Sequence, residues 1–249
     1  MAAEINISLA AEPIAHLGSF PITNSMLGSL LAGGVLTLIA CAAAKRPKMV
    51  PTKLQNGAEM IIEFLLNLMD SVTHDRAKTK KFFPVIATIF LFIMSMNWMG
   101  LLPIFGTIGL NEVHDGHKVF IPFLRAGTAD LNMTIAIAMI SVISAQVFGV
   151  MYIGIKKHLR KYFNPNPTFT FVGIIEFISE FTKIISFSFR LFGNVFAGEV
   201  LLLVIATLLP LIGPLPFYFL ELFVGFIQGF VFALLSLVFF TIASTAEEH

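Results

Sequence analysis

The chain has 249 residues, of which 57% are hydrophobic and only 12% are charged, and its mean hydropathy is +0.87. Soluble domains carry about 25% charged residues, so this composition excludes an ordinary soluble protein and indicates an integral membrane protein. The net charge of +1 carries little information, because the distribution of the charges matters more than their sum, and no nucleic-acid partner is expected.

The cysteine content and the N-terminal tail exclude further kinds of protein and site. The single cysteine, Cys41, excludes a disulfide framework and a cysteine-based metal site. The first residues, Met1 to Glu4, lack the basic segment of a cleavable signal peptide, so the first apolar run is expected to remain as a span. No large soluble domain fits, and residues 1–249 are expected to form one integral membrane domain.

Five apolar segments are long enough to cross a bilayer as helices, which takes about 20 residues each. They predict an all-α membrane protein with spans at about 22–44, 82–104, 130–155, 169–209 and 215–245. Residues 52–75 differ, because Glu59, Glu63, Asn67 and Asp70 recur at helical spacing among apolar residues. This pattern predicts an amphipathic helix on the inner membrane surface.

Basic residues predict the orientation of the spans. The N-terminal tail has none, and the 105–129 loop has only Lys118 and Arg125. Basic clusters instead follow the first and third spans, at 45–53, 76–81 and 156–161. By the positive-inside rule the N-terminus is expected outside and the C-terminus in the cytoplasm.

The last two helices are longer than a bilayer requires. Phe169 to Leu209 would extend roughly 60 Å at about 1.5 Å per residue, twice the roughly 30 Å of a hydrocarbon core. An unbroken helix of that length has to tilt strongly. We therefore expect a long, strongly tilted hairpin, unless the helix breaks near Lys183 and stands upright beyond it.

Arg190 is the most informative residue, because it lies within a strongly apolar stretch. A guanidinium at bilayer depth costs roughly 2.5–3.5 kcal/mol on insertion scales, and it cannot shed its proton. At about 100° per residue, one helix face carries Arg190, small residues and a polar stripe, whereas Glu199 lies on the opposite face. The other residues of the Arg190 face are Glu176, Ser179, Lys183, Ser186, Gly193, Asn194 and Ala197.

The last helix carries a second carboxyl, Glu221, on one face with Gly225 and Gln228. Because two successive helices run antiparallel, Glu199 and Glu221 are expected on the same, outer side of Arg190. Two neighbouring carboxyls in a low-dielectric environment are suited to exchanging a proton.

Simpler roles remain open for most of these residues. Glu176, Glu180 and Lys183 could form a charge network near the inner surface, and Asn194 could be a hydrogen-bonding contact between helices. Glu199 and Glu221 could merely bind each other, and Arg190 could form an inert ion pair. Asp130 and Asn132 could cap the third span. The loop residues Glu112, His114 and His117 lack fixed metal-ligand spacing, so no metal site is expected.

The chain resembles subunit a of the F-type ATP synthase. The resemblance rests on R190-L-F-G-N194-x-x-A-G-E199, on E221 with Q228, on the A243-S-T-A-E-E-H249 tail, and on three further segments. Those segments are D130-L-N132, N97-W-M-G-L-L-P103 and residues 47–68. It covers most of the chain, and the arginine motif is highly specific.

The resemblance implies a proton-translocating stator with two offset half-channels, separated by Arg190 and open to the carboxylates of a c-subunit ring. It implies a proton path through Asn194, Glu199, Glu221 and Gln228. Asp130 and Asn132 would lie at the outer mouth, and Glu176 and Ser179 in the inner half-channel. Many bacterial members have histidine where this chain has Glu221, which leaves the pH dependence of the inlet open.

The same resemblance implies partners and location. The partners would be the c-ring, peripheral stalk b subunits, the remaining synthase subunits and membrane lipid, most simply in a bacterial inner membrane. The chain would be non-catalytic and would need no cofactor, since it has no phosphate-binding loop.

Two alternatives come from other classes. A secondary proton/cation antiporter would bind its ion within the chain, but no internal repeat is visible in the sequence. A membrane-embedded enzyme would need a nucleophile and base within the spans, and the sequence offers no such set. Copurification with a ring of small hydrophobic chains would separate the synthase from both.

Overall fold

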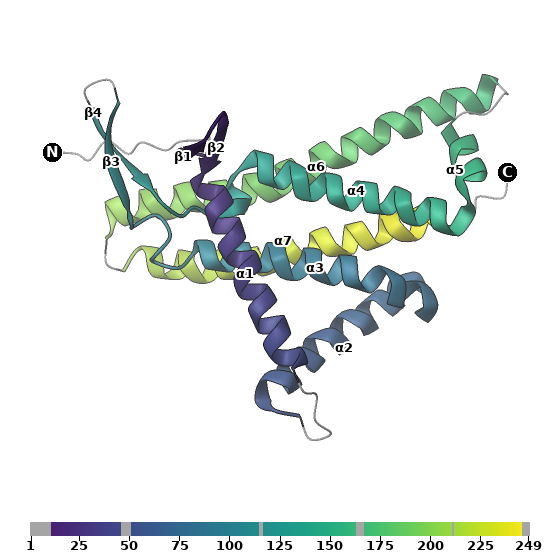
Figure 1. Ribbon diagram of the computed structural model, residues 1–249, viewed down its shortest axis with the longest axis horizontal. Helices are drawn as coiled ribbons and strands as arrows, with labels where there is room; N and C mark the ends of the chain where they lie inside the picture. The colour runs from purple at the N-terminus through teal and green to yellow at the C-terminus, as the bar shows by residue number, and fades with distance from the viewer. Residues whose placement is uncertain (1–10, 46–50, 115–116, 163–166, 211, 246–249) are drawn as a thin grey trace. The chain divides into compact units, whose positions relative to one another are not determined.

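A computed structural model describes residues 11–45, 51–114, 117–162, 167–210 and 212–245 (Figure 1). Five of its helices are long and apolar enough to cross a membrane, which confirms the prediction of an all-α membrane protein. They are α1 (Asn24–Ala44), α3 (Arg76–Gly100), α4 (Leu131–Ile153), α6 (Pro167–Leu208) and α7 (Pro214–Ala243).

Local chemistry accounts for the bounds that differ from the predicted ones. Helix α3 begins at Arg76, ahead of the apolar run, because the Asp75 carboxylate caps it by accepting a hydrogen bond from the Ala77 amide at 2.8 Å. Helix α4 ends at Ile153, where Gly154 takes a left-handed conformation with φ +88°. A short basic helix, α5 (Ile155–Tyr162), follows and was not predicted.

The expected surface helix is α2 (Lys53–Thr73). The Thr52 hydroxyl accepts from the Gln55 amide at its start, and His74 ends it in a left-handed conformation with φ 51°. Leu65 and Met69 are buried, whereas apolar residues on other faces, including Met60 and Phe64, are exposed. The helix therefore packs on one side and offers further apolar surface on another, as an interfacial helix would.

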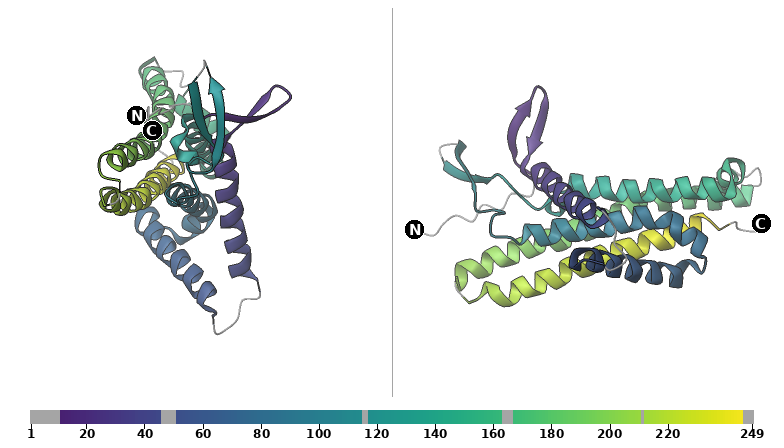
Figure 2. Two further views of the ribbon diagram at one scale, coloured as in Figure 1. Left: turned by 90° about the vertical axis from the view of Figure 1, so that its left-hand side faces the viewer. Right: turned by 60° about the horizontal axis from the view of Figure 1, so that its bottom comes forward.

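Two β-hairpins were missed by the sequence analysis. One joins β1 (Pro13–Leu17) to β2 (Phe20–Thr23) and leads into α1, and the other joins β3 (Gly109–His114) to β4 (His117–Pro122) (Figure 2). Both pair antiparallel, and the first turns at Gly18, whose φ of +66° suits glycine. Each hairpin has only two short strands, and over so few residues the alternation typical of a strand cannot be distinguished from a loop sequence.

The described residues group into two compact units whose boundaries fall inside the long helices. The first contains residues up to 38, 91–134 and 189–229, and the second contains 39–90, 135–188 and 230 onward. Helix α6 is continuous through residues of both units, so the alternative of a break near Lys183 is wrong. The tilt of α6 and α7 in a membrane stays a prediction.

In the first unit, small residues let the segment before α4 pack closely against α1 and α3. A Cβ at Gly28 would lie 2.1 Å from the Arg125 carbonyl oxygen, and one at Gly127 would lie 2.0 Å from the Ser29 hydroxyl. A Cβ at Gly100 would meet the Ala126 side chain at 2.6 Å. These contacts fix the backbone that carries Arg125.

The second unit has an aromatic core. Phe82 is fully buried, and its ring lies 4.8 Å from that of Phe148 and 5.6 Å from that of Phe240 in edge-on geometry. The Phe148 and Phe240 rings are 5.2 Å apart. This triad ties α3, α4 and α7 together within the unit.

Candidate functional site

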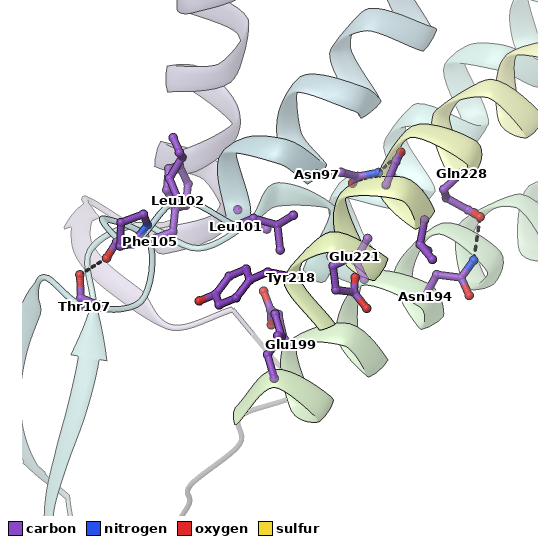
Figure 3. A pocket seen from close by; sticks show the side chains of 17 residues that line it. Asn97, Leu101, Leu102, Phe105, Thr107, Asn194, Glu199, Tyr218, Glu221 and Gln228 are labelled. Carbon is purple, nitrogen blue, oxygen red and sulfur yellow. Dashed lines mark hydrogen bonds between the residues drawn. The ribbon is translucent and has the colours of Figure 1, made fainter. Parts of the chain in front are cut away.

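A cavity of about 160 Å³ lies within the first unit, between the end of α3, the loop that follows it, α6 and α7 (Figure 3). Most of its wall is apolar, but seven side chains bring polar groups to it: Asn97, Thr107, Asn194, Glu199, Tyr218, Glu221 and Gln228. The structure therefore brings together four predicted site residues and adds Asn97, Thr107 and Tyr218. A cavity of this size with polar groups in its wall has room for several water molecules.

Glycine 198 allows the two carboxyls to share the cavity. A Cβ at Gly198 would lie 2.3 Å from the Glu221 carboxyl carbon and from both of its oxygens. The Glu221 carboxyl thus lies directly over the backbone of α6, one residue before Glu199. Any side chain at position 198 would displace that carboxyl, so the small residue next to Glu199 is part of the site.

Arg125 pairs with Glu199, an interaction that the sequence analysis missed. Nη2 of Arg125 lies 3.2 Å from Oε2 of Glu199, and the arginine side chain is only 11% exposed. The two residues are 74 positions apart, so no local spacing links them. The only sequence signal was that the 105–129 loop has just two basic residues.

Two amides of the cavity wall join the helices. The Asn194 Nδ2 donates to Oε1 of Gln228 at 2.7 Å, and the Asn97 Nδ2 donates to the Gly225 carbonyl at 3.0 Å. The contact between helices that was considered for Asn194 is therefore present. Within the described part of the chain, Nε2 of Gln228 and Oδ1 of Asn97 are buried without a protein partner. Both atoms are available to bind water in the cavity.

Arg190 lies on α6 about one turn before Asn194 and does not line the cavity. Its side chain is exposed, as are Gly193, Asn194 and Ala197 on the same face. Leu191 is fully buried, which shows that the helix packs into the unit through a different face. Arg190 is thus exposed beside small residues that a neighbouring helix could approach closely.

Asp130 and Asn132 do not line the cavity. Asp130 is 7% exposed, and its carboxylate accepts one hydrogen bond from the Ser25 hydroxyl at 2.6 Å and another from the Asn132 amide at 3.0 Å. It therefore caps α4 and ties it to α1, which is the structural role considered from the sequence. The Asn132 side chain is exposed.

Glu176 belongs to the second unit, where it lines a smaller cavity of about 30 Å³. The polar side chains that share this cavity are Gln146, His158, Tyr162, Glu180 and Lys183. The Gln146 Oε1 lies 2.8 Å from Nε2 of His158 and accepts from the Tyr162 hydroxyl at 3.1 Å. Ser179 is half-buried on α6 and is not part of the lining.

Charge also gathers at this second cavity. Lys183 donates to Glu180 at 2.7 Å, so part of the charge network considered from the sequence is present. Burial raises the pKa of Tyr162 to about 12, and the neighbouring Glu180 and Glu176 add to that shift. His158 and Tyr162 were missed because α5 was not predicted, and Gln146 of α4 carried no sequence signal.

No group of three or more potential metal ligands occurs among the described residues. The side chains of Glu112, His114 and His117 lie outside the described part of the structure, as does Asp115.

Comparisons with known proteins agree with the resemblance. Residues 26–241 match the model of a family described as ATP synthase A chain. Over 238 residues the chain is 29% identical to the ATP synthase subunit a of Moorella thermoacetica, an alignment that covers 95% of this chain and 96% of the relative.

The Asn194–Gln228 hydrogen bond predicts a measurable coupling between α6 and α7. We expect the Asn194→Ala and Gln228→Ala effects on unfolding in detergent to be coupled by about 0.6 kcal/mol, a typical value for membrane helices. Thr207→Ala is the matched control, because the Thr207 hydroxyl donates to the Val204 carbonyl within its own helix. The contact would be contradicted if Gln228→Ala were coupled to Thr207→Ala as strongly as it is to Asn194→Ala.

Proposed function

This chain belongs to the ATP synthase A chain family, subunit a of the F-type enzyme, and we propose that it is the stator through which protons reach the rotor. It is a multi-pass membrane protein, and its family is a membrane subunit of a larger complex. In our proposal two half-channels end at different positions on a c-ring. A proton then crosses only by riding the ring between them.

The outer half-channel is assigned to the cavity of the first unit. Glu199 and Glu221 supply carboxyls that accept and release protons, while Asn194, Gln228 and water carry the hydrogen-bonded path between them. The observation that carries the proposal is that α6 presents Glu199 to this cavity and Arg190 to the outside.

Arg190 is assigned the barrier between the half-channels. It holds a positive charge at every physiological pH, so it attracts a deprotonated rotor carboxylate and repels a free proton. The small residues Gly193 and Ala197 on its face would let a rotor helix approach.

The inner half-channel is assigned to the region of Glu176 and Ser179. Glu176 lines the small polar cavity of the second unit, where a glutamate and a histidine could both bind protons. Asp130 and Asn132 are proposed to lie near the outer mouth, where the carboxylate of Asp130 also holds α4 in place.

The length of α6 supports offset half-channels. Its 42 residues extend roughly 63 Å, which fits a hydrocarbon layer of about 30 Å only if the helix lies strongly tilted. A tilted α6 would run along a curved ring and present its two ends to different rotor positions. The driving force would be about 2.3 kcal/mol per proton for each 100 mV.

Location, partners and orientation complete the proposal. The chain would act with the c-ring and peripheral stalk b subunits in a bacterial inner membrane, with the N-terminus outside and the C-terminus in the cytoplasm. ATP chemistry would belong to other subunits.

Arg190→Lys is expected to abolish ATP-driven proton pumping in inverted membrane vesicles, although it keeps a basic residue. A lysine lacks the planar fork of arginine and can lose its proton when desolvated. Arg190→Ala is expected to abolish pumping and to open a passive leak after the ATPase head is removed. The matched control, Phe189→Leu, changes an exposed neighbour and should pump normally. Near-normal pumping by Arg190→Lys would refute the barrier role.

Glu199 and Glu221 are expected to act as one unit. Each Gln replacement should lower passive proton flux at least about a hundredfold, the low end for a proton-transferring side chain, and the double variant should lose little more. Gly198→Ala should mimic Glu221→Gln, because its Cβ displaces the Glu221 carboxyl. Glu63→Gln, on an exposed position of α2, is the control. Independent, multiplying losses would place the carboxyls in separate paths.

A further inference from the structure

The backbone of Arg125 contacts α1 and lies next to Ala126, which lines the first cavity. The Arg125 amide donates to the Asn24 carbonyl at 3.4 Å, and its carbonyl packs against Gly28 of α1. The residues that follow, 126–129, are buried. The backbone from which the side chain extends is therefore packed against α1.

The Arg125 guanidinium lies beside the Glu199 carboxylate, where any other cation bound to that carboxylate would also have to lie. Its Nη2 is 3.2 Å from the carboxylate, and little of the side chain is exposed. A buried guanidinium cannot neutralise itself, so its charge is permanent. The titratable groups that face the pair across the cavity are Glu221 and Tyr218 of α7, and the wall supplied by α3 is the neutral Asn97.

Without that charge, the cavity would suit a monovalent metal ion. Hard cations bind oxygen ligands, and this wall offers carboxylates from Glu199 and Glu221 and the Tyr218 hydroxyl. The cavity volume of about 160 Å³ also leaves space for an ion with some of its water.

We infer that Arg125 is a specificity-determining residue, whose guanidinium keeps sodium from binding at Glu199 while leaving the carboxyls open to protons. The inference rests on the proposed function of this cavity as the outer half-channel. It adds selectivity for protons over sodium, which the pair of carboxyls alone does not provide.

The selectivity follows from how each ion binds. The guanidinium opposes the binding of either cation, but a proton forms a covalent bond to one carboxyl oxygen and needs no coordination shell. A sodium ion keeps its full charge and would have to lie within a few ångströms of the guanidinium. Like charges at that distance repel strongly in a medium of lower dielectric constant than water.

The test is the effect of sodium on ATP-driven proton pumping by the whole complex in inverted vesicles. Sodium chloride is varied up to about 100 mM, with choline chloride holding the ionic strength and its screening constant. We expect less than a twofold effect on the native complex and on Arg125→Lys, whose ammonium keeps its charge because the Glu199 carboxylate lies beside it. We expect Arg125→Gln to become several-fold inhibited by sodium.

Each other outcome counts against the inference. Sodium-insensitive pumping by Arg125→Gln would overturn it, as would uptake of radioactive sodium by the native complex. Arg125→Met keeps much of the aliphatic stem and carries the same expectation if Arg125→Gln fails to assemble. Failure of the proposed function would look different, because the native complex would then pump no protons or Arg190→Lys would pump normally.

Discussion

An ionised side chain in an apolar helix has to meet a counter-charge or water, and the site depends on how α6 satisfies this requirement on two faces. Glu199 points into a cavity of about 160 Å³, where Arg125 pairs with it at 3.2 Å. Arg190 lies nine positions earlier and is exposed. Glu199 thus meets its counter-charge inside the unit, whereas Arg190 lies on an exposed face of the same helix.

Glycine has the complementary role of letting polar groups approach. Gly198 leaves the space that the Glu221 carboxyl fills, and Gly225 brings the Asn97 side chain within 3.0 Å of where a Cβ would stand. Gly28 and Gly127 let the Arg125 segment press against α1. Close backbone approach is how membrane helices pack where the hydrophobic effect contributes little, and here it also assembles the cavity.

Helix content was predictable from the sequence, because apolar runs of span length have no other stable form in a bilayer. Helical periodicity also predicted that Arg190 and Glu199 lie on different faces of their helix, with Glu199 toward the last helix. Arg125 could not be found that way, since its partner is distant in sequence and it lies in a loop. Asp130 was ambiguous for another reason: a carboxylate before a span fits a helix cap as well as a channel mouth, and its observed contacts are those of a cap.

The central claim is that α6 lies along a rotor and turns Arg190 toward it, and a density map of the assembled membrane sector tests this most directly. The account predicts α6 at more than about 45° to the membrane normal, since roughly 63 Å of helix cannot stand in about 30 Å of hydrocarbon. It also predicts the Arg190 guanidinium beside a buried carboxylate of a neighbouring small chain. An upright α6, or an Arg190 that faces only lipid, would contradict it.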